Sequence, residues 1–131
     1  MDNMSLTTFQ NTVKDSQVRN KSMIDIMTKL TESSARINRA VAKSITLCGC
    51  IDLTAHKQSI PFESSLDDAL KLLTHQVNGD ICEHCLEILQ DEIGNHLLYV
   101  ASLCNALNID LNKTAQEELD KVTTLGKYSM L

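Results

Sequence analysis

The 131-residue chain has a formal net charge of -5 and contains 43% hydrophobic but only 3% aromatic residues. An acidic chain without a Lys/Arg cluster is poorly matched to the phosphates of a nucleic acid, so we expect no nucleic-acid partner. No apolar run approaches the roughly 18 residues that a membrane-spanning helix needs, so we also expect no membrane partner. Length and composition predict one domain, residues 1–131, with an aliphatic core.

The first two predicted elements are a short helix and a long one. Residues 5–18 place a few apolar side chains on one face at helical spacing, which predicts the short helix. Ser22, with Asp25 three residues later, has the pattern of a helix start. Apolar residues then recur in steps of three and four through residues 22–47, which predicts a long helix with one buried stripe. In this stripe we expect burial of Ile26, Leu30, Ile37 and Val41.

Residues 51–81 separate this helix from a second long one. The stretch after residue 50 contains the only proline, Pro61, and has no clear period, so we expect a loop there. A short helix is predicted over about 64–75, and residues 78–80 carry a turn signal. We therefore interpret 51–81 as an inserted connection with one short helix.

The second long helix is predicted over residues 82–107, and a final helix over about 111–123. Gly126 is expected to end the final helix, and residues 127–131 form a tail. In the second long helix we expect burial of Ile93, Leu97, Val100 and Leu103. The predicted fold is therefore all-α, with four or five helices, two of them long and antiparallel.

A second apolar stripe is expected on the outside of the two long helices. Unburied stripes of this kind favour association, so we expect a homo-oligomer. The residues assigned to this stripe are Ile24, Met27, Leu98 and Ala101.

The segment from Asp91 to Val100, DEIGNHLLYV, is the most informative part of the chain. Continued through residues 103–111, it resembles the C-terminal half of the MazG-like nucleoside triphosphate pyrophosphohydrolases. In that family a helix carrying Glu-x-x-Asp precedes an apolar stretch, a short break and a last helix. Leu30–Ile37 lies where the family has the pattern Leu-x-Glu-Glu-x-Gly-Glu-Leu. The resemblance implies a MazG-like helical bundle that assembles as a dimer or tetramer. It also implies four carboxylates on two helices that bind Mg²⁺, which activates water to split a triphosphate into monophosphate and pyrophosphate.

Several positions of the family pattern hold other residues in this chain. Ser33, Arg36 and Asn95 stand where acids are expected, so Glu32 and Glu92 are the remaining carboxylates. Arg36 places a cation where the metal would bind and could pair with either glutamate. His96, one turn after Glu92, could orient that glutamate or contact a phosphate. The candidate site residues are Glu32, Arg36, Glu92, Asn95 and His96.

Three functions remain open at this point. The first is a MazG-like protein that has lost most of its Mg²⁺ ligands and acts as a nucleotide-binding, regulatory or interaction module. The second is an active Mg²⁺-dependent pyrophosphohydrolase that uses Glu32 and Glu92 with another acid such as Glu87 or Asp91. The third is an interaction module without a ligand.

Two cysteine pairs mark the ends of the inserted connection. Cys48 and Cys50 end the first long helix, whereas Cys82 and Cys85 begin the second. Antiparallel packing would bring the pairs together, and four thiols at such spacing predict a structural zinc site. The alternative is that these thiols are small apolar core residues.

Other sequence features complete this expectation. His56 or His84 could replace one thiolate, and Cys104 is expected to be a core residue. Residues 1–10 lack the basic and apolar regions of a secretory signal, so we expect a cytoplasmic protein with reduced thiols.

Overall fold

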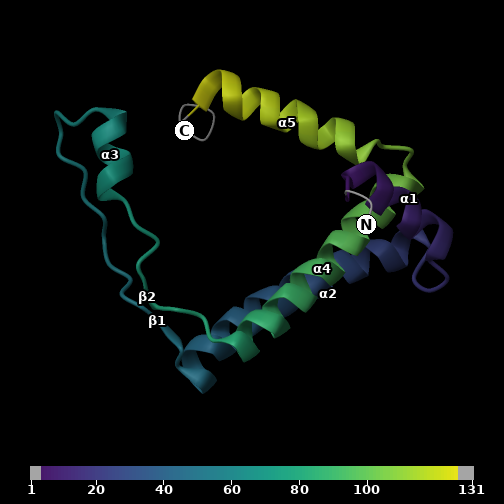
Figure 1. Ribbon diagram of the computed structural model, residues 1–131, viewed down its shortest axis with the longest axis horizontal. Helices are drawn as coiled ribbons and strands as arrows, with labels where there is room; N and C mark the ends of the chain where they lie inside the picture. The colour runs from purple at the N-terminus through teal and green to yellow at the C-terminus, as the bar shows by residue number, and fades with distance from the viewer. Residues whose placement is uncertain (1–3, 127–131) are drawn as a thin grey trace.

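Two long antiparallel helices organise the chain in the computed structural model, which describes residues 4–126 (Figure 1). Helix α2 spans Met23–Lys43 and α4 spans Glu83–Ala106, and they lie side by side along most of their length. The Ser22 side chain accepts a hydrogen bond from the backbone N–H of Asp25 at 3.2 Å, which confirms the predicted helix start. α2 continues into a π-helical turn, η1 (Ser44–Cys48), so the predicted long helix ends close to its expected boundary.

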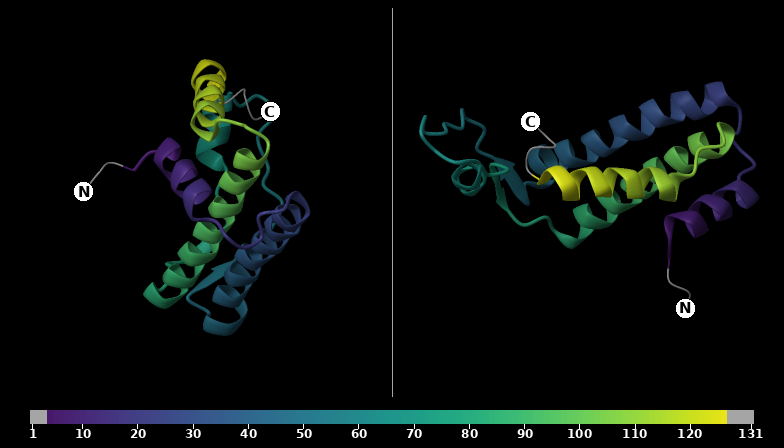
Figure 2. Two further views of the ribbon diagram at one scale, coloured as in Figure 1. Left: turned by 90° about the vertical axis from the view of Figure 1, so that its right-hand side faces the viewer. Right: turned by 90° about the horizontal axis from the view of Figure 1, so that it is seen from above.

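Two further helices flank one end of this hairpin (Figure 2). α1, Leu6–Ser16, packs on the C-terminal half of α4. α5, Leu111–Leu125, follows a turn after α4, touches α1, and has no buried residue. Gly126 caps α5 as expected, and residues 127–131 lie outside the described part of the chain. No helix within residues 4–126 combines the length and apolar character needed to cross a lipid bilayer.

The inserted connection is an arm that contains a small sheet, which was not predicted from the sequence. Strands β1 (Ile51–Leu53) and β2 (Val77–Gly79) pair antiparallel, with Ile51 opposite Gly79. The turn predicted at residues 78–80 is therefore wrong, because 78 and 79 belong to a strand. Beyond the strands, side-chain amides join the two legs of the arm. The Gln58 side chain forms two hydrogen bonds with the backbone of Thr74, and the Gln76 side chain forms two with the backbone of His56. The predicted short helix is present as α3, Leu66–Leu72.

The core differs from the predicted one in which face of α4 is buried. Ile26 is 1% exposed as expected, but Ile93 and Leu97 are 40% and 46% exposed. Ala101, expected outside, is 0% exposed. The face of α4 that meets α2 runs through Glu92 and His96, about 100° away from Ile93 and Leu97.

The cover supplied by α1 explains the buried alanine. Gln17 and Gln10, which belong to the α1 segment, bond Ser102 and Asn105 and so fix α1 on that half of α4. The remaining residues predicted to be buried are half-buried: Leu30, Ile37, Val41, Val100 and Leu103. Of the second predicted stripe, Ile24 and Met27 are exposed and Leu98 is half-buried.

Candidate functional site

Four cysteine thiols gather at the neck between the helical hairpin and the arm. Cys48 and Cys50 lie where η1 gives way to β1, whereas Cys82 caps α4 and Cys85 lies in its first turn. Their four Sγ atoms all lie within 4.8 Å of one another, and Cys48 Sγ is 3.8 Å from Cys82 Sγ. All four are free thiols, so the cluster could hold a metal ion, as the position of the pairs predicted.

Two glycines give the neck its shape. Gly49 has φ 77°, a left-handed conformation that ends η1 and separates Cys48 from Cys50. Gly79 has φ 84°, and a Cβ atom there would lie 2.6 Å from the carbonyl oxygen of Cys50. Because only glycine tolerates both the φ value and this close approach, Gly79 lets β2 run directly against the cysteine segment.

Hydrogen bonds among the thiols separate their pKa values. The backbone N–H of Cys85 donates to Cys82 Sγ at 3.4 Å and lowers the pKa of Cys82 to about 7. For Cys85, the Ser44 hydroxyl favours the thiolate, but the hydrogen bond to Cys82 together with burial raises the pKa to about 12. The neighbouring thiols are thus hydrogen-bonded to one another, and a metal cation that binds them as thiolates would displace their protons.

The histidines proposed as substitute ligands are not part of this cluster. His56 lies in the arm, where its Nδ1 is 3.0 Å from the carbonyl oxygen of Thr54. His84 is exposed on α4 beside the cysteines, and the metal-ligand group found within residues 4–126 consists of cysteines alone. Cys104 is buried on α4 as expected, and burial raises its pKa.

The altered carboxylate face forms a second feature, midway along the hairpin. Arg36 of α2 donates from Nε to Glu92 Oε2 of α4 at 3.0 Å. Next to this ion pair, Ser33 Oγ lies 2.8 Å from His96 Nδ1. The two predicted faces therefore meet, and each contact joins the helices through a residue that stands where the family pattern has an acid.

The remaining acids do not converge on this point. Glu32 bonds its own helix, with Oε2 3.1 Å from Lys29 Nζ and Oε1 3.7 Å from Arg36 Nη1. Asn95 is exposed, as are Glu87 and Asp91. Within residues 4–126, carboxylates form no group of three or more that is placed to share a cation.

Cations dominate the groove beside the Arg36–Glu92 pair. Arg36, Arg39 and Lys43 line a cavity of about 280 Å³ together with Ile88 and Glu92. Residues 33–51 contain these three cations and no acid, which is a local reversal of the chain's negative charge. This groove was not predicted from the sequence, although basic residues about one helical turn apart indicate it.

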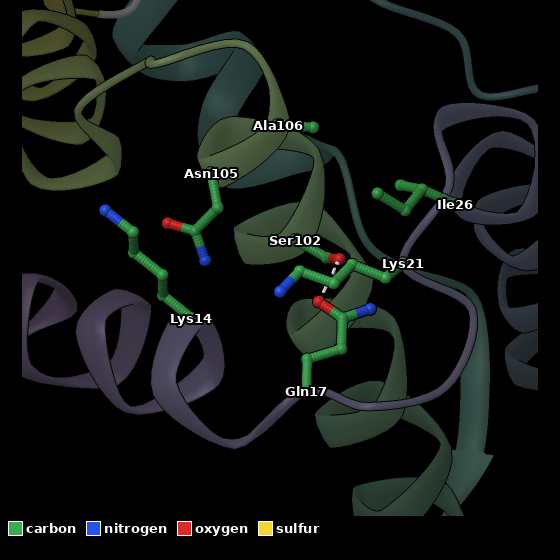
Figure 3. A pocket seen from close by; sticks show the side chains of 7 residues that line it. All are labelled: Lys14, Gln17, Lys21, Ile26, Ser102, Asn105 and Ala106. Carbon is green, nitrogen blue, oxygen red and sulfur yellow. Dashed lines mark hydrogen bonds between the residues drawn. The ribbon is translucent and has the colours of Figure 1, made fainter.

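A smaller cavity of about 140 Å³ lies where α1 and the following loop meet α4 (Figure 3). The Ser102 hydroxyl donates to Gln17 Oε1 at 2.6 Å in its wall, and Lys14 and Lys21 lie at its edge. None of the residues predicted for the functional site lines this cavity.

Comparisons of this chain with protein-family models, with curated proteins and with solved structures give no match.

Proposed function

We propose that this chain is a zinc-stabilised helical module, similar to the MazG-like proteins, that binds or regulates rather than hydrolyses. The observation that carries this proposal is the Arg36–Glu92 pair at 3.0 Å. A guanidinium satisfies the carboxylate that would otherwise bind Mg²⁺, so the face is close to neutral without metal. Glu32 forms ion pairs with Lys29 and Arg36 of its own helix, so too few carboxylates remain to bind a divalent cation.

Zinc is the metal that best fits the four thiols at the neck. Zn²⁺ prefers four cysteine ligands in a tetrahedron, and Zn–S bonds of about 2.3 Å place the sulfur atoms about 3.8 Å apart. The Cys48–Cys82 distance of 3.8 Å agrees with this spacing, and the 4.8 Å limit on the others requires only small adjustments. The metal would join the end of η1 to the start of α4 and thereby fix the arm. The proposal requires a reducing compartment, such as the cytoplasm.

The positive charge of the groove favours an anionic ligand. The likeness to the MazG-like family suggests that this ligand is the phosphate group of a nucleotide. Arg36 is held by Glu92, whereas Arg39 and Lys43 make no ion pair within residues 4–126. These two free cations could contact phosphate oxygens without any metal. Binding without turnover would make the protein a sensor or carrier of such a ligand.

The alternative, an active pyrophosphohydrolase, is tested by pyrophosphate release. The full chain is incubated with Mg²⁺ and a panel of ribo- and deoxyribonucleoside triphosphates. We expect no release above the buffer rate with any of them. Turnover of order 1 s⁻¹ or faster with one substrate would establish the enzyme and reject the module.

A further inference from the structure

The cysteine cluster at the neck joins two segments that lie far apart in the sequence. Cys48 and Cys50 precede the arm, whereas Cys82 and Cys85 follow it. Cys48 Sγ and Cys82 Sγ, which lie 3.8 Å apart, belong to residues 34 positions apart in the chain. A covalent bond between these two sulfur atoms would therefore connect the same segments that a bound zinc ion connects.

The four thiols differ in their access to solvent. Cys48 is exposed and Cys82 is half-buried, whereas Cys85 is buried at 8% exposure. Cys50 is half-buried, and its thiol donates a hydrogen bond to the carbonyl oxygen of Ser44 at 3.8 Å. Cys48 is thus the thiol that a small molecule in solution meets first, and Cys82 is its partner at 3.8 Å.

The neck leaves room for the Cys48 and Cys82 sulfur atoms to approach each other. A disulfide has an S–S distance of about 2.05 Å, so the present separation would shrink by about 1.8 Å. Both neighbours of Cys48 are exposed, and a Cβ atom built on one of them, Gly49, would meet nothing within 4 Å. The exposed Cys48 side chain can therefore change its rotamer without displacing a packed neighbour.

An exposed thiolate beside a second thiol is the arrangement of oxidant-sensitive cysteines. The exposed sulfur is oxidised to a sulfenic acid, and the neighbouring sulfur converts this acid to a disulfide. Cysteines that bind zinc are all thiolates, so exposure rather than acidity decides which of them reacts first. In this cluster Cys48 takes the first role by its exposure, and Cys82 takes the second by its distance.

We propose that the neck is an oxidant-sensitive switch, in which a hydroperoxide exchanges the zinc ion for a disulfide between Cys48 and Cys82. This inference rests on the proposed zinc site and names how that site is regulated. After oxidation, Cys50 and Cys85 remain as thiolate ligands, and two ligands are too few for a structural zinc ion. The disulfide keeps the base of the arm closed after the metal has left.

With hydrogen peroxide as the oxidant, the reaction proceeds in two substitution steps. The Cys48 thiolate attacks one peroxide oxygen, so an S–O bond forms, the O–O bond breaks and hydroxide leaves. The Cys82 thiolate then attacks the Cys48 sulfur, so the S–S bond forms, the S–O bond breaks and a second hydroxide leaves. The two sulfur atoms together lose two electrons, and the two hydroxides become water by taking up two protons.

The first test follows zinc in the full chain. Reduced protein is loaded with one equivalent of ZnCl₂, freed of excess metal and treated with hydrogen peroxide in the presence of a chromogenic zinc chelator. We expect release of all the bound zinc, at about one ion per chain, whereas the ion should stay bound without peroxide. Treatment with a phosphine reductant should restore the capacity to bind added ZnCl₂.

The second test identifies the disulfide by peptide mapping without reductant. Trypsin cuts the chain into peptides 44–57 and 72–113, which contain the two halves of the cluster. We expect peroxide to join these peptides in metal-free protein too, because the product is the same whichever thiol reacts first. Cys48→Ser should abolish the joined peptide. Cys50→Ser, the matched control, removes a thiol from the same segment and should retain it.

Failure of the inference and failure of the zinc site give different results. Zinc that stays bound in excess peroxide overturns the inference alone, as does a disulfide within either peptide in place of the joined one. A Cys48→Ser protein that still forms the joined peptide overturns it too. Reduced protein that binds no added ZnCl₂ rejects the proposed function, and the inference falls with it.

Discussion

At the scale of single residues, Arg36 determines what the middle of the hairpin can do. Its guanidinium bonds Glu92 across the seam and lies 3.7 Å from Glu32 on its own helix. A cation fixed between two carboxylates neutralises their charge, as a metal ion would, and engages Oε2 of Glu92 and Oε1 of Glu32. The charged face can therefore stay folded without Mg²⁺, which four converging carboxylates could not do because they repel.

Restoring acids to this face should create a Mg²⁺ site. We expect the triple variant Ser33→Glu, Arg36→Glu, Asn95→Asp to bind Mg²⁺ and to gain about 2.7 kcal/mol of stability when Mg²⁺ is at 100 times its dissociation constant. The measurement is thermal unfolding with and without MgCl₂, together with calorimetric titration. The control is Arg36→Gln, which removes the cation but adds no acid and should gain nothing. A triple variant that folds yet ignores Mg²⁺ would show that the two faces are not placed for a metal.

A second residue-scale prediction concerns the pH dependence of Cys82 in metal-free protein. Its folded pKa of about 7 lies below that of an ordinary thiol, so the reactive thiolate is present above pH 7 and is lost as the pH falls through that value. We expect iodoacetamide to modify Cys82 first, with a rate about five-fold lower at pH 6 than at pH 7. Peptide mass mapping gives the rates. Cys104, whose pKa burial raises, is the internal reference, and equal rates at the two thiols would contradict the assignment.

At the scale of elements, the neck depends on how closely β2 passes the cysteine segment. Gly79→Ala forces a Cβ atom to 2.6 Å from the Cys50 carbonyl oxygen at a φ of 84°. We expect a loss of about 1–3 kcal/mol in the free energy of unfolding, measured by urea denaturation. Gly94→Ala is the matched control, since its Cβ meets nothing within 4 Å and a helix interior gains about 0.5–1 kcal/mol from the exchange. An unchanged urea midpoint for Gly79→Ala would mean that the neck is not tightly packed.

The elements also show which parts of the fold could be predicted from sequence. The long helices α2 and α4 were predictable because their apolar residues repeat over many turns and Ser22 supplies a recognisable cap. The strands β1 and β2 were not, because three residues are too few to show an alternating pattern and the paired segments lie far apart in sequence. The ladder of glutamine side chains that extends them carries no sequence signal either.

The choice of buried face on α4 was wrong for a physical reason. Apolar residues occupy several sides of this helix, so periodicity alone could not tell the side that meets α2 from the exposed side that carries Ile93 and Leu97. The hydrogen bonds that join α4 to α2 are polar and involve Glu92 and His96, which bond Arg36 and Ser33.

At the scale of the whole molecule, the chain combines a neck with four clustered cysteine thiols and a charged face on which a guanidinium pairs with a carboxylate. The cysteine cluster was predictable because helix ends fix where the pairs lie once the long helices pack antiparallel. The pairing of Arg36 with Glu92 was only partly predictable, because both Glu32 and Glu92 were possible partners from the sequence. In the structure, Glu92 forms the short ion pair with Arg36, whereas Glu32 also forms an ion pair with Lys29.

We propose that this protein holds a structural zinc ion at its neck and no Mg²⁺ on its charged face. The most direct test is elemental analysis of the full chain, purified without chelator, by inductively coupled plasma mass spectrometry. We expect about one zinc ion per chain, bound by Cys48, Cys50, Cys82 and Cys85, and no stoichiometric magnesium. Protein that is folded yet free of zinc, or that carries magnesium in its place, would contradict it.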